Sequence, residues 1–220
     1  VKYDSNNKKK WTKQIGTPKE EKANGITIDS SNNIYISGYT KGKFDNDTYS
    51  SRPDIFLSKF NSGGINQWIK SCGTPFDDYS NGIAVDSSGN IYISGYTKGD
   101  FDNDSITANP DIILLKYNSS GTKLWYKQIG TSFDDRGNGI AIDSSNNIYI
   151  TGYSKGDLDN NTNSGRSDAF LMKFDSGGSK QWTKLIGTSS DDIANDIIID
   201  SSNYIYITGY SNGQFDNHTN

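Results

Sequence analysis

A repeat of 57 residues runs through this chain and constrains its fold more than any other feature. Tryptophans and Gly-Thr pairs both recur at this spacing without a gap or an insertion. A fixed period of this length, rich in short strands and turns, is typical of β-propellers and not of helical solenoids. The repeated positions are Trp11, Trp68, Trp125 and Trp182, followed in each copy by Gly16, Gly73, Gly130 and Gly187.

Each repeat predicts four short strands, as the second copy illustrates. Residues 82–86 and 91–96 alternate in polarity on either side of a Ser-Ser-Gly-Asn turn. Residues 111–117 predict a third strand and residues 123–129 a fourth, which carries Trp125. No stretch has a sustained apolar period of 3.6 residues, so we expect almost no helix. The sequence therefore predicts an all-β fold, a β-propeller built of four 57-residue four-stranded blades.

The phase of the repeat divides one blade between the two ends of the chain. Residues 1–5 align with residues 172–176, which lie in the predicted third strand of the third copy. We therefore expect a single propeller domain over residues 1–220, in which residues 1–15 complete the last blade. Such a ring closes either on the same chain, as four blades, or with a second chain, as a larger ring. A start within a strand also fits a piece of a longer repeat array.

Composition excludes several classes of protein. Only 32% of the residues are hydrophobic and the mean hydropathy is -0.74, but 14 Tyr, 9 Phe and 4 Trp are too many for a disordered chain. The net charge of -4 argues against a nucleic-acid surface. No apolar run approaches the roughly 18 residues that cross a bilayer, so we expect no membrane insertion. Cys72 and His218 are single, which leaves no disulfide within the chain and no zinc cluster.

Two segments of the second repeat carry a family resemblance. They read GIAVDSSGNIYISGYTKGDFDND over residues 82–104 and DIILLKYNSSGTKLWYKQIGTSFDD over residues 111–135. Together they resemble the bacterial seven-bladed β-propeller repeat (SBBP) family, found in predicted secreted and surface proteins. The resemblance extends over essentially the whole chain and implies an extracellular or cell-surface protein of a bacterium. It implies no catalytic residues and no common ligand, and four repeats depart from the seven blades of the family name.

The loops between the second and third predicted strands are acidic and suggest a calcium site. Carboxylates at alternate positions turn several oxygens toward one point, and an acid at the twelfth position can close the shell. The glycine expected at the sixth position is absent, and the twelfth residue is Asp where calcium loops have Glu. The alternative is that these residues form Asx-turns and cap strand ends. The candidate Ca²⁺ ligands are Asp100, Asp102, Asp104 and Asp111 in one loop, and Asp157, Asp159, Asn161 and Asp168 in the other.

The acidic pair after each Gly-Thr pair forms a second candidate site. Strand alternation predicts that these loops share one edge of the propeller with the calcium loops, where sequence can vary without disturbing the core. Two carboxylates can serve as general acid and base, as in glycosidases, but four equivalent copies favour a turn role. The loop phenylalanines beside them are candidates for stacking on a sugar. The candidate ligand-binding residues are Phe76, Asp77, Asp78, Phe133, Asp134 and Asp135.

Two tyrosine ladders recur with the repeat and have two interpretations. We expect them to pack between blades, because strand aromatics supply much of the apolar area of a lean core; the alternative is that they stack on sugars. Cys72 is expected to be a small buried strand residue, since its counterparts are isoleucines. The ladders are Tyr35, Tyr92, Tyr149 and Tyr206, and Tyr39, Tyr96, Tyr153 and Tyr210.

These patterns favour binding or assembly over catalysis. The chain has no P-loop, no dinucleotide fingerprint and no Ser/His/Asp set. We expect a non-catalytic extracellular or cell-surface module that binds a protein or glycan partner through its loops, or self-associates through its N- and C-terminal strands. One alternative is a purely structural repeat unit. The other is a glycan-active enzyme that uses the loop carboxylates.

Overall fold

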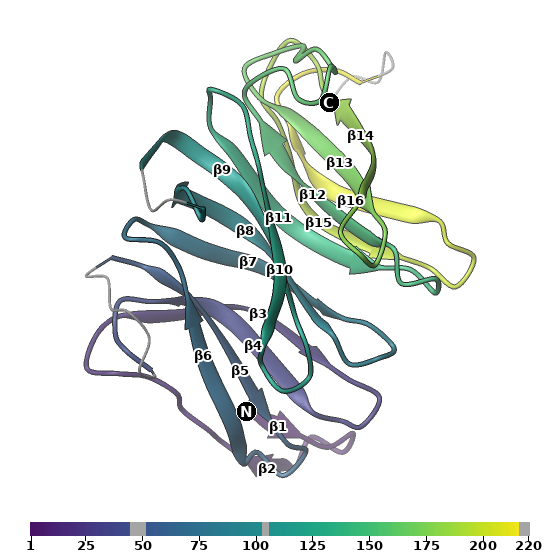
Figure 1. Ribbon diagram of the computed structural model, residues 1–220. Helices are drawn as coiled ribbons and strands as arrows, with labels where there is room; N and C mark the ends of the chain where they lie inside the picture. Colours follow the sequence, from purple (N-terminus) through teal and green to yellow (C-terminus); the bar gives the residue numbers. More distant parts are fainter. Residues whose placement is uncertain (45–51, 103–105, 216–220) are drawn as a thin grey trace.

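Every regular element in the described part of the chain is a β-strand. The computed structural model describes residues 1–44, 52–102 and 106–215, and three antiparallel four-stranded sheets form three complete blades (Figure 1). No helix in these residues could cross a membrane. Blade 1 consists of β3 (Glu21–Ile28), β4 (Ile34–Thr40), β5 (Asp54–Phe60) and β6 (Asn66–Cys72); blade 2 of β7 (Asp78–Val85), β8 (Ile91–Gly99), β9 (Ile106–Tyr117) and β10 (Lys123–Ile129); blade 3 of β11 (Asp135–Ile142), β12 (Ile148–Ser154), β13 (Asp168–Phe174) and β14 (Lys180–Ile186).

The remaining strands form two hairpins, which we call the split blade. The outer half is β1 (Lys2–Tyr3) with β2 (Lys9–Trp11), and the inner half is β15 (Asp192–Ile199) with β16 (Ile205–Ser211). The pairs Lys2↔Trp11 and Tyr3↔Lys9 repeat the register of Lys173↔Trp182 and Phe174↔Lys180 in blade 3. In the described residues no sheet joins the two halves, which lie at opposite ends of an open arc in Figure 1. Completion of the last blade by residues 1–15 therefore stays a prediction.

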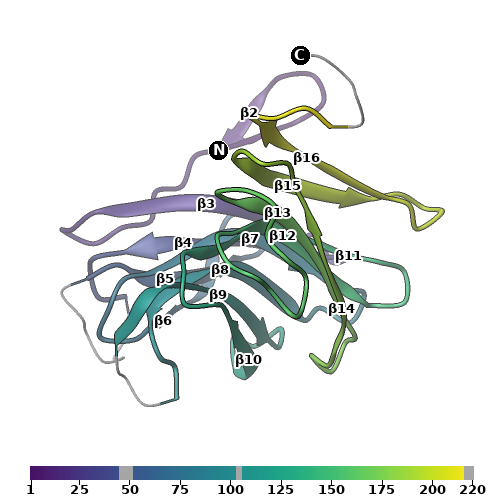
Figure 2. The ribbon, with the colours of Figure 1, turned by 90° about the horizontal axis from the view of Figure 1, so that it is seen from above.

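The blades follow one another with their faces packed together (Figures 1 and 2). The third strands β5 and β9 are buried on both faces, and Ile112 to Leu115 of β9 have no exposed surface. Tyr35 and Tyr92 are also fully buried, each within a hydrophobic cluster that spans two blades. The prediction that this tyrosine ladder packs between blades is thus confirmed for these two residues. Apolar area comes from strand faces that close against neighbouring sheets, which explains how so polar a chain acquires a core.

The inner hairpin of each blade ends in the same Asx-turn. In blade 2, Asp86 accepts hydrogen bonds from the backbone amides of Ser88 and Asn90 at 2.9 and 2.8 Å, and from the hydroxyl of Tyr92 at 3.0 Å. The predicted turn at Ser-Ser-Gly-Asn of the second repeat is thus confirmed. A single carboxylate therefore fixes the turn and also satisfies the hydroxyl of a buried tyrosine.

Candidate functional site

One edge of the propeller carries the long and variable connections. In blade 2 the first and third strands start where the second and fourth strands end. The cross-strand pairs that show this are Asp78↔Thr97, Thr97↔Asp111 and Ile112↔Ile129. The connections from a fourth strand to the next blade and from a second to a third strand therefore leave from the same edge, as the strand alternation predicts. We call it the loop-rich edge.

A row of half-buried aromatic and cationic side chains crosses three blades along this edge. The rings of Tyr39 and Tyr79 meet edge to face with centroids 4.9 Å apart, and Tyr79 stacks on Tyr96 at 4.8 Å. The guanidinium carbon of Arg136 lies 4.4 Å from the centroid of Tyr96. Arg136 is in turn the cross-strand partner of Tyr153. We call these five residues the tyrosine row. Ring and cation–π contacts join the first four, and strand pairing places Tyr153 beside Arg136.

Carboxylates orient the two ends of the tyrosine row. The hydroxyl of Tyr39 donates to Glu20 at 2.7 Å, and this hydrogen bond raises the pKa of Tyr39 to about 12. The hydroxyl of Tyr153 donates to Asp134 at 3.3 Å. Burial raises the pKa of Tyr96, also to about 12. The tyrosines are therefore neutral hydrogen-bond donors at physiological pH.

Ion pairs surround the tyrosine row. Asp134 receives a bidentate contact from Arg136 at 2.8 and 3.1 Å, while Asp77 lies 2.9 Å from Lys98 and 3.6 Å from Arg52. Within the described part of the chain, five basic and three acidic groups take part in these ion pairs. They are Lys41, Arg52, Lys98, Arg136 and Lys155, with Glu20, Asp77 and Asp134.

The tyrosine row lies where the repeats differ from one another. At the second residue of each first strand the four copies carry Lys22, Tyr79, Arg136 and Ile193, although the residue opposite is always tyrosine. Sequence reasoning missed Tyr79 and Arg136, because it followed the residues that all four copies share. The available signal was a variable position in an otherwise regular repeat, since variation on a fixed scaffold is where binding preference is set.

Each of these acidic pairs contains one buried, structural aspartate and one aspartate at the surface. Asp78 and Asp135 have no exposed surface. The backbone amide and hydroxyl of Thr74 donate to Asp78 at 2.6 and 3.0 Å, and Thr131 donates to Asp135 in the same way. Asp77 and Asp134, by contrast, reach the surface beside the tyrosine row. Ligand binding by these four residues stays a prediction, and the geometry supports it for Asp77 and Asp134 alone.

The two candidate loop phenylalanines have different surroundings. Phe76 is half-buried, and the guanidinium carbon of Arg52 lies 5.8 Å from its ring centroid. Phe133 exposes 55% of its surface. Of the two, Phe133 presents the freer ring to a ligand, although no ligand contact by either residue is established.

The candidate calcium ligands are engaged separately in the structure, and Asp104 lies outside the described residues. The backbone amides of Asp102 and Asn163 donate to Asp100 and Asp157, each at 2.8 Å. Tyr126 donates to Asp102, whereas Lys180 and Thr183 bind Asp159. Gln128 donates to Asp111 at 2.8 Å, Ser164 to Asp168 at 2.7 Å, and Asn161 itself donates to a backbone carbonyl. This geometry favours Asx-turns and strand caps over a shared cation, but calcium binding stays a prediction.

Carboxyl groups do meet elsewhere, between the third strand of one blade and the first strand of the next. A Cβ built on Gly73 would lie 2.4 Å from Asp54 Oδ1 and 2.9 Å from Asp78 Oδ2, so this glycine gives the two carboxyls room. Burial raises the pKa of Asp78 to about 7, and the nearby charge of Asp54 adds to the shift. Burial also raises the pKa of Asp111 and Asp135, which form the next pair. In the described residues no three His, Cys, Asp or Glu side chains form a group that could hold a metal.

Comparison with known families agrees with this architecture. The β-propeller repeat family (SBBP) matches four segments, residues 10–45, 67–102, 124–159 and 181–216. The chain belongs to the β-propeller repeat family. Each matched segment contains the tryptophan, the Gly-Thr pair, the acidic pair and both inner strands of one blade. The segments also include the positions of the tyrosine row, so the row is built on the family scaffold.

Two curated relatives match this chain over short parts of much longer chains. The chain is 25% identical over 225 residues to the uncharacterized WD repeat-containing protein L264 of Acanthamoeba polyphaga mimivirus, covering 93% of this chain and 13% of that protein. It is 26% identical over 176 residues to the regulatory protein FlaEY of Caulobacter vibrioides, covering 73% and 18% respectively. The chain thus spans less than a fifth of either relative.

A solved structure supports the fold alone. A protein of unknown function from Bacteroides caccae aligns with a TM-score of 0.50 at 11% sequence identity. The alignment covers 85% of this chain and 53% of that one. The family membership therefore makes this chain a repeat protein of the β-propeller type.

Proposed function

We propose that this propeller is a non-catalytic binding module that holds a protein partner at the tyrosine row. The observation that carries the proposal is a continuous line of tyrosine and arginine side chains across three blades of the loop-rich edge. Tyrosine and arginine are the residues enriched among binding hot spots, because they bury large areas and still make directional polar contacts. We place the protein outside the cell or at its surface, in keeping with the resemblance given above.

The packing within the row favours a protein partner over a glycan. A sugar stacks on a free ring face, but Tyr79 and Tyr96 cover each other and Arg136 lies over Tyr96. What remains accessible are ring edges, hydroxyl groups and the basic groups around them. Five basic against three acidic groups favour an acidic partner surface. A glycan is the second candidate ligand, and the 55% exposed ring of Phe133 supports it.

The carboxylate geometry supports a non-catalytic role. Glycoside hydrolysis needs two carboxyl groups that face the same substrate. Asp78 and Asp135 are buried under threonine donors, whereas Asp77 and Asp134 are paired with lysine and arginine. Neither acidic pair therefore presents two free carboxyl groups to one ligand. This argument disfavours the glycan-active alternative at these residues.

An array experiment tests the proposal. The chain is applied to acidic and neutral peptide arrays and to a glycan array, beside Arg136→Ala, Tyr79→Ala and Phe133→Ala. Lys184→Ala serves as control, because Lys184 is an exposed basic residue on the outer strand β14. We expect binding to acidic peptides that Arg136→Ala and Tyr79→Ala weaken at least about tenfold, while the control binds normally. Glycan binding lost only in Phe133→Ala would establish the second candidate, and blank arrays throughout would refute both.

A further inference from the structure

A buried pair of carboxyl groups lies between blades 1 and 2, at the loop-rich edge. Asp54 begins β5 and is 7% exposed, whereas Asp78 begins β7 and has no exposed surface. The backbone amide of Asp78 donates to the carbonyl oxygen of Pro53 at 2.7 Å, which holds the two strand starts side by side. Asp54 Oδ1 and Asp78 Oδ2 lie 2.4 and 2.9 Å from the point where Gly73 would carry a Cβ. We call these two groups, which share one small space, the carboxyl pair.

The carboxyl pair adjoins the contact through which the tyrosine row crosses from blade 1 to blade 2. Tyr79 directly follows Asp78 in β7, and its ring meets that of Tyr39 in β4 with the centroids 4.9 Å apart. Because Asp78 and Tyr79 share a peptide bond, a shift of β7 at the carboxyl group also moves the ring. The same two blades are thus joined by a carboxyl pair inside and by a tyrosine pair nearer the surface.

Ionisation of both carboxyl groups is unfavourable here, because Asp78 is shielded from water. Its Oδ2 accepts hydrogen bonds from Thr74, but no lysine or arginine among the described residues forms an ion pair with it. Burial raises the pKa of Asp78 to about 7, and the charge of Asp54 adds to the shift. One proton therefore stabilises this interface, and its loss near neutral pH leaves two negative charges between the blades.

We propose that the carboxyl pair is a proton-operated latch that controls partner binding at the tyrosine row. With Asp78 protonated, the blades stay packed, and Tyr39 and Tyr79 offer one continuous surface. With both carboxyl groups ionised, their repulsion loosens the start of β7 and separates the two rings. The inference rests on the binding proposed for the tyrosine row and adds its regulation, in which a partner is held at pH 6 and released at pH 8.

The elements packed against β7 bring other titratable groups to the same edge. A hydrogen bond between Lys41 and Glu20 lowers the pKa of Glu20 and raises that of Lys41. Burial raises the pKa of the Cys72 thiol at the end of β6 and that of the Tyr79 hydroxyl. These four groups therefore keep one charge state from pH 6 to pH 8. The other charged groups at this edge are Glu21 and Lys22 of β3, Arg52 before β5, Asp77 and Lys98 of blade 2, and Asp135 and Arg136 of β11.

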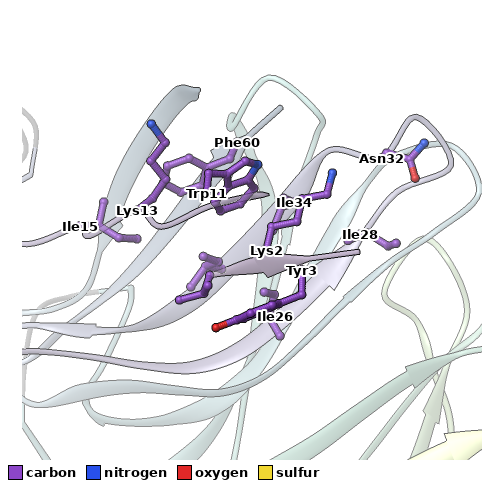
Figure 3. A pocket seen from close by; sticks show the side chains of 12 residues that line it. Lys2, Tyr3, Trp11, Lys13, Ile15, Ile26, Ile28, Asn32, Ile34 and Phe60 are labelled. Carbon is purple, nitrogen blue, oxygen red and sulfur yellow. The ribbon is translucent and has the colours of Figure 1, made fainter. Parts of the chain in front are cut away.

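A cavity elsewhere on blade 1 is separate from this unit (Figure 3). It has a volume of about 370 Å³ and lies against β3 and β4, with Trp11, Ile26 and Ile34 among its walls. None of the described residues that line it is an aspartate, glutamate or histidine, and none belongs to the tyrosine row. The carboxyl pair and the tyrosine row therefore form a unit of which this cavity is not a part.

Binding measured against pH tests the latch, and the probe is the acidic peptide that binds best on the array. The peptide is acetylated and amidated and contains no histidine, so its own charge is constant between pH 6 and pH 8. Because only the fraction of protein with Asp78 protonated is competent, the wild-type Kd should rise up to about tenfold between pH 6 and pH 8. Asp78→Asn should bind at both pH values as the wild type does at pH 6. Asp143→Asn is the control and should keep the wild-type response, because Asp143 is ionised throughout this range.

A second measurement needs no partner. The ring signals of Tyr39 and Tyr79 in NMR spectra, assigned with Tyr39→Phe and Tyr79→Phe, report how the two rings face each other. We expect both signals to shift with a common midpoint near pH 7 in the wild type and not in Asp78→Asn. Asp54→Asn should move the midpoint to lower pH, because it removes the neighbouring charge. Asp135→Asn should leave the midpoint unchanged, since burial raises the pKa of Asp135 at the next interface and not at this one.

The outcomes separate the latch from the binding that it regulates. Ring signals that do not titrate, or that titrate equally in Asp78→Asn, overturn the latch, and so does peptide binding that is the same at pH 6 and at pH 8. Peptide binding that is absent at every pH refutes the proposed function and its regulation together. The first failure leaves a peptide bound at the tyrosine row, whereas the second leaves none.

Discussion

Asn81 reaches from one blade into the next: its side-chain amide donates to the carbonyl oxygen of Gly137, 2.8 Å away. The residue lies in the bulge of β7, where the pairing with β8 skips from Ser80 to Gly82. Because the bulge releases Asn81 from the ladder, its side chain can satisfy the backbone of the neighbouring first strand. One asparagine in each of the first three repeats thereby joins first strands that share no sheet.

Replacing this asparagine should destabilise the arc. Asn81→Ala leaves the carbonyl of Gly137 without its donor in a partly buried position. We expect the free energy of unfolding to fall by roughly 1–3 kcal/mol, measured by denaturant titration. Asn66→Ala is the control, since Asn66 is exposed in an outer strand and should change stability by less than about 0.5 kcal/mol. Equal effects of the two variants would contradict the interblade role.

A second prediction concerns the close approach of neighbouring first strands. A Cβ at Gly82 would come within 2.6 Å of Ser94 Oγ and 2.8 Å of the carbonyl oxygen of Asn138. Gly82→Ala must therefore push two blades apart, and we expect a loss of roughly 1–3 kcal/mol in unfolding free energy. Gly63→Ala is the matched control, because the nearest atom to its Cβ is a flexible side-chain oxygen at 3.3 Å. A neutral Gly82→Ala would show that the blades are not held at this spacing.

The repeat predicts the blade because each copy must bury the same faces. Gly121 and Gly178 lie against Trp68 and Trp125 in the same way for that reason. It does not predict the tyrosine row, because Tyr79 and Arg136 are departures from the repeat. Nor does it reveal that Asp54 meets Asp78, since the two belong to different blades and only packing brings them together. The acidic pair was singled out as a unit, but successive strand residues point to opposite faces, which separates Asp77 from Asp78.

The buried carboxyl pair should make stability depend on pH. The pKa of Asp78 is raised from 3.8 to about 7, so the folded state holds this proton more tightly than the unfolded state. The bound proton therefore stabilises the folded state. This stabilisation is fully present below the pKa of the unfolded state and is lost as the pH rises through about 7. Burial raises the pKa of Asp111 and of Asp135 as well. We expect the melting temperature to fall between pH 5 and pH 8, measured by thermal melts in buffers of constant ionic strength.

Asp78→Asn isolates this contribution, because the amide keeps one acceptor oxygen and cannot ionise. We expect the melting temperature of this variant to fall less between pH 5 and pH 8 than that of the wild type. Asp143→Asn is the control: hydrogen bonds from Asn147 and Ser145 lower the pKa of Asp143, so it is ionised throughout this range. A variant at Asp78 that keeps the full wild-type slope would place the pH dependence in other groups.

The last prediction concerns the acidic loops between second and third strands. Their carboxylates already accept hydrogen bonds, from backbone amides at Asp100 and Asp157 and from Lys180 and Thr183 at Asp159. A cation would have to displace these donors to gather the oxygens it needs. We therefore expect the melting temperature to be the same in EDTA and in millimolar calcium, while Asp157→Ala lowers it through the lost hydrogen bond from the backbone amide of Asn163. A fall in EDTA that calcium reverses, and that Asp157→Asn or Asp102→Asn abolishes, would instead establish the loops as calcium sites.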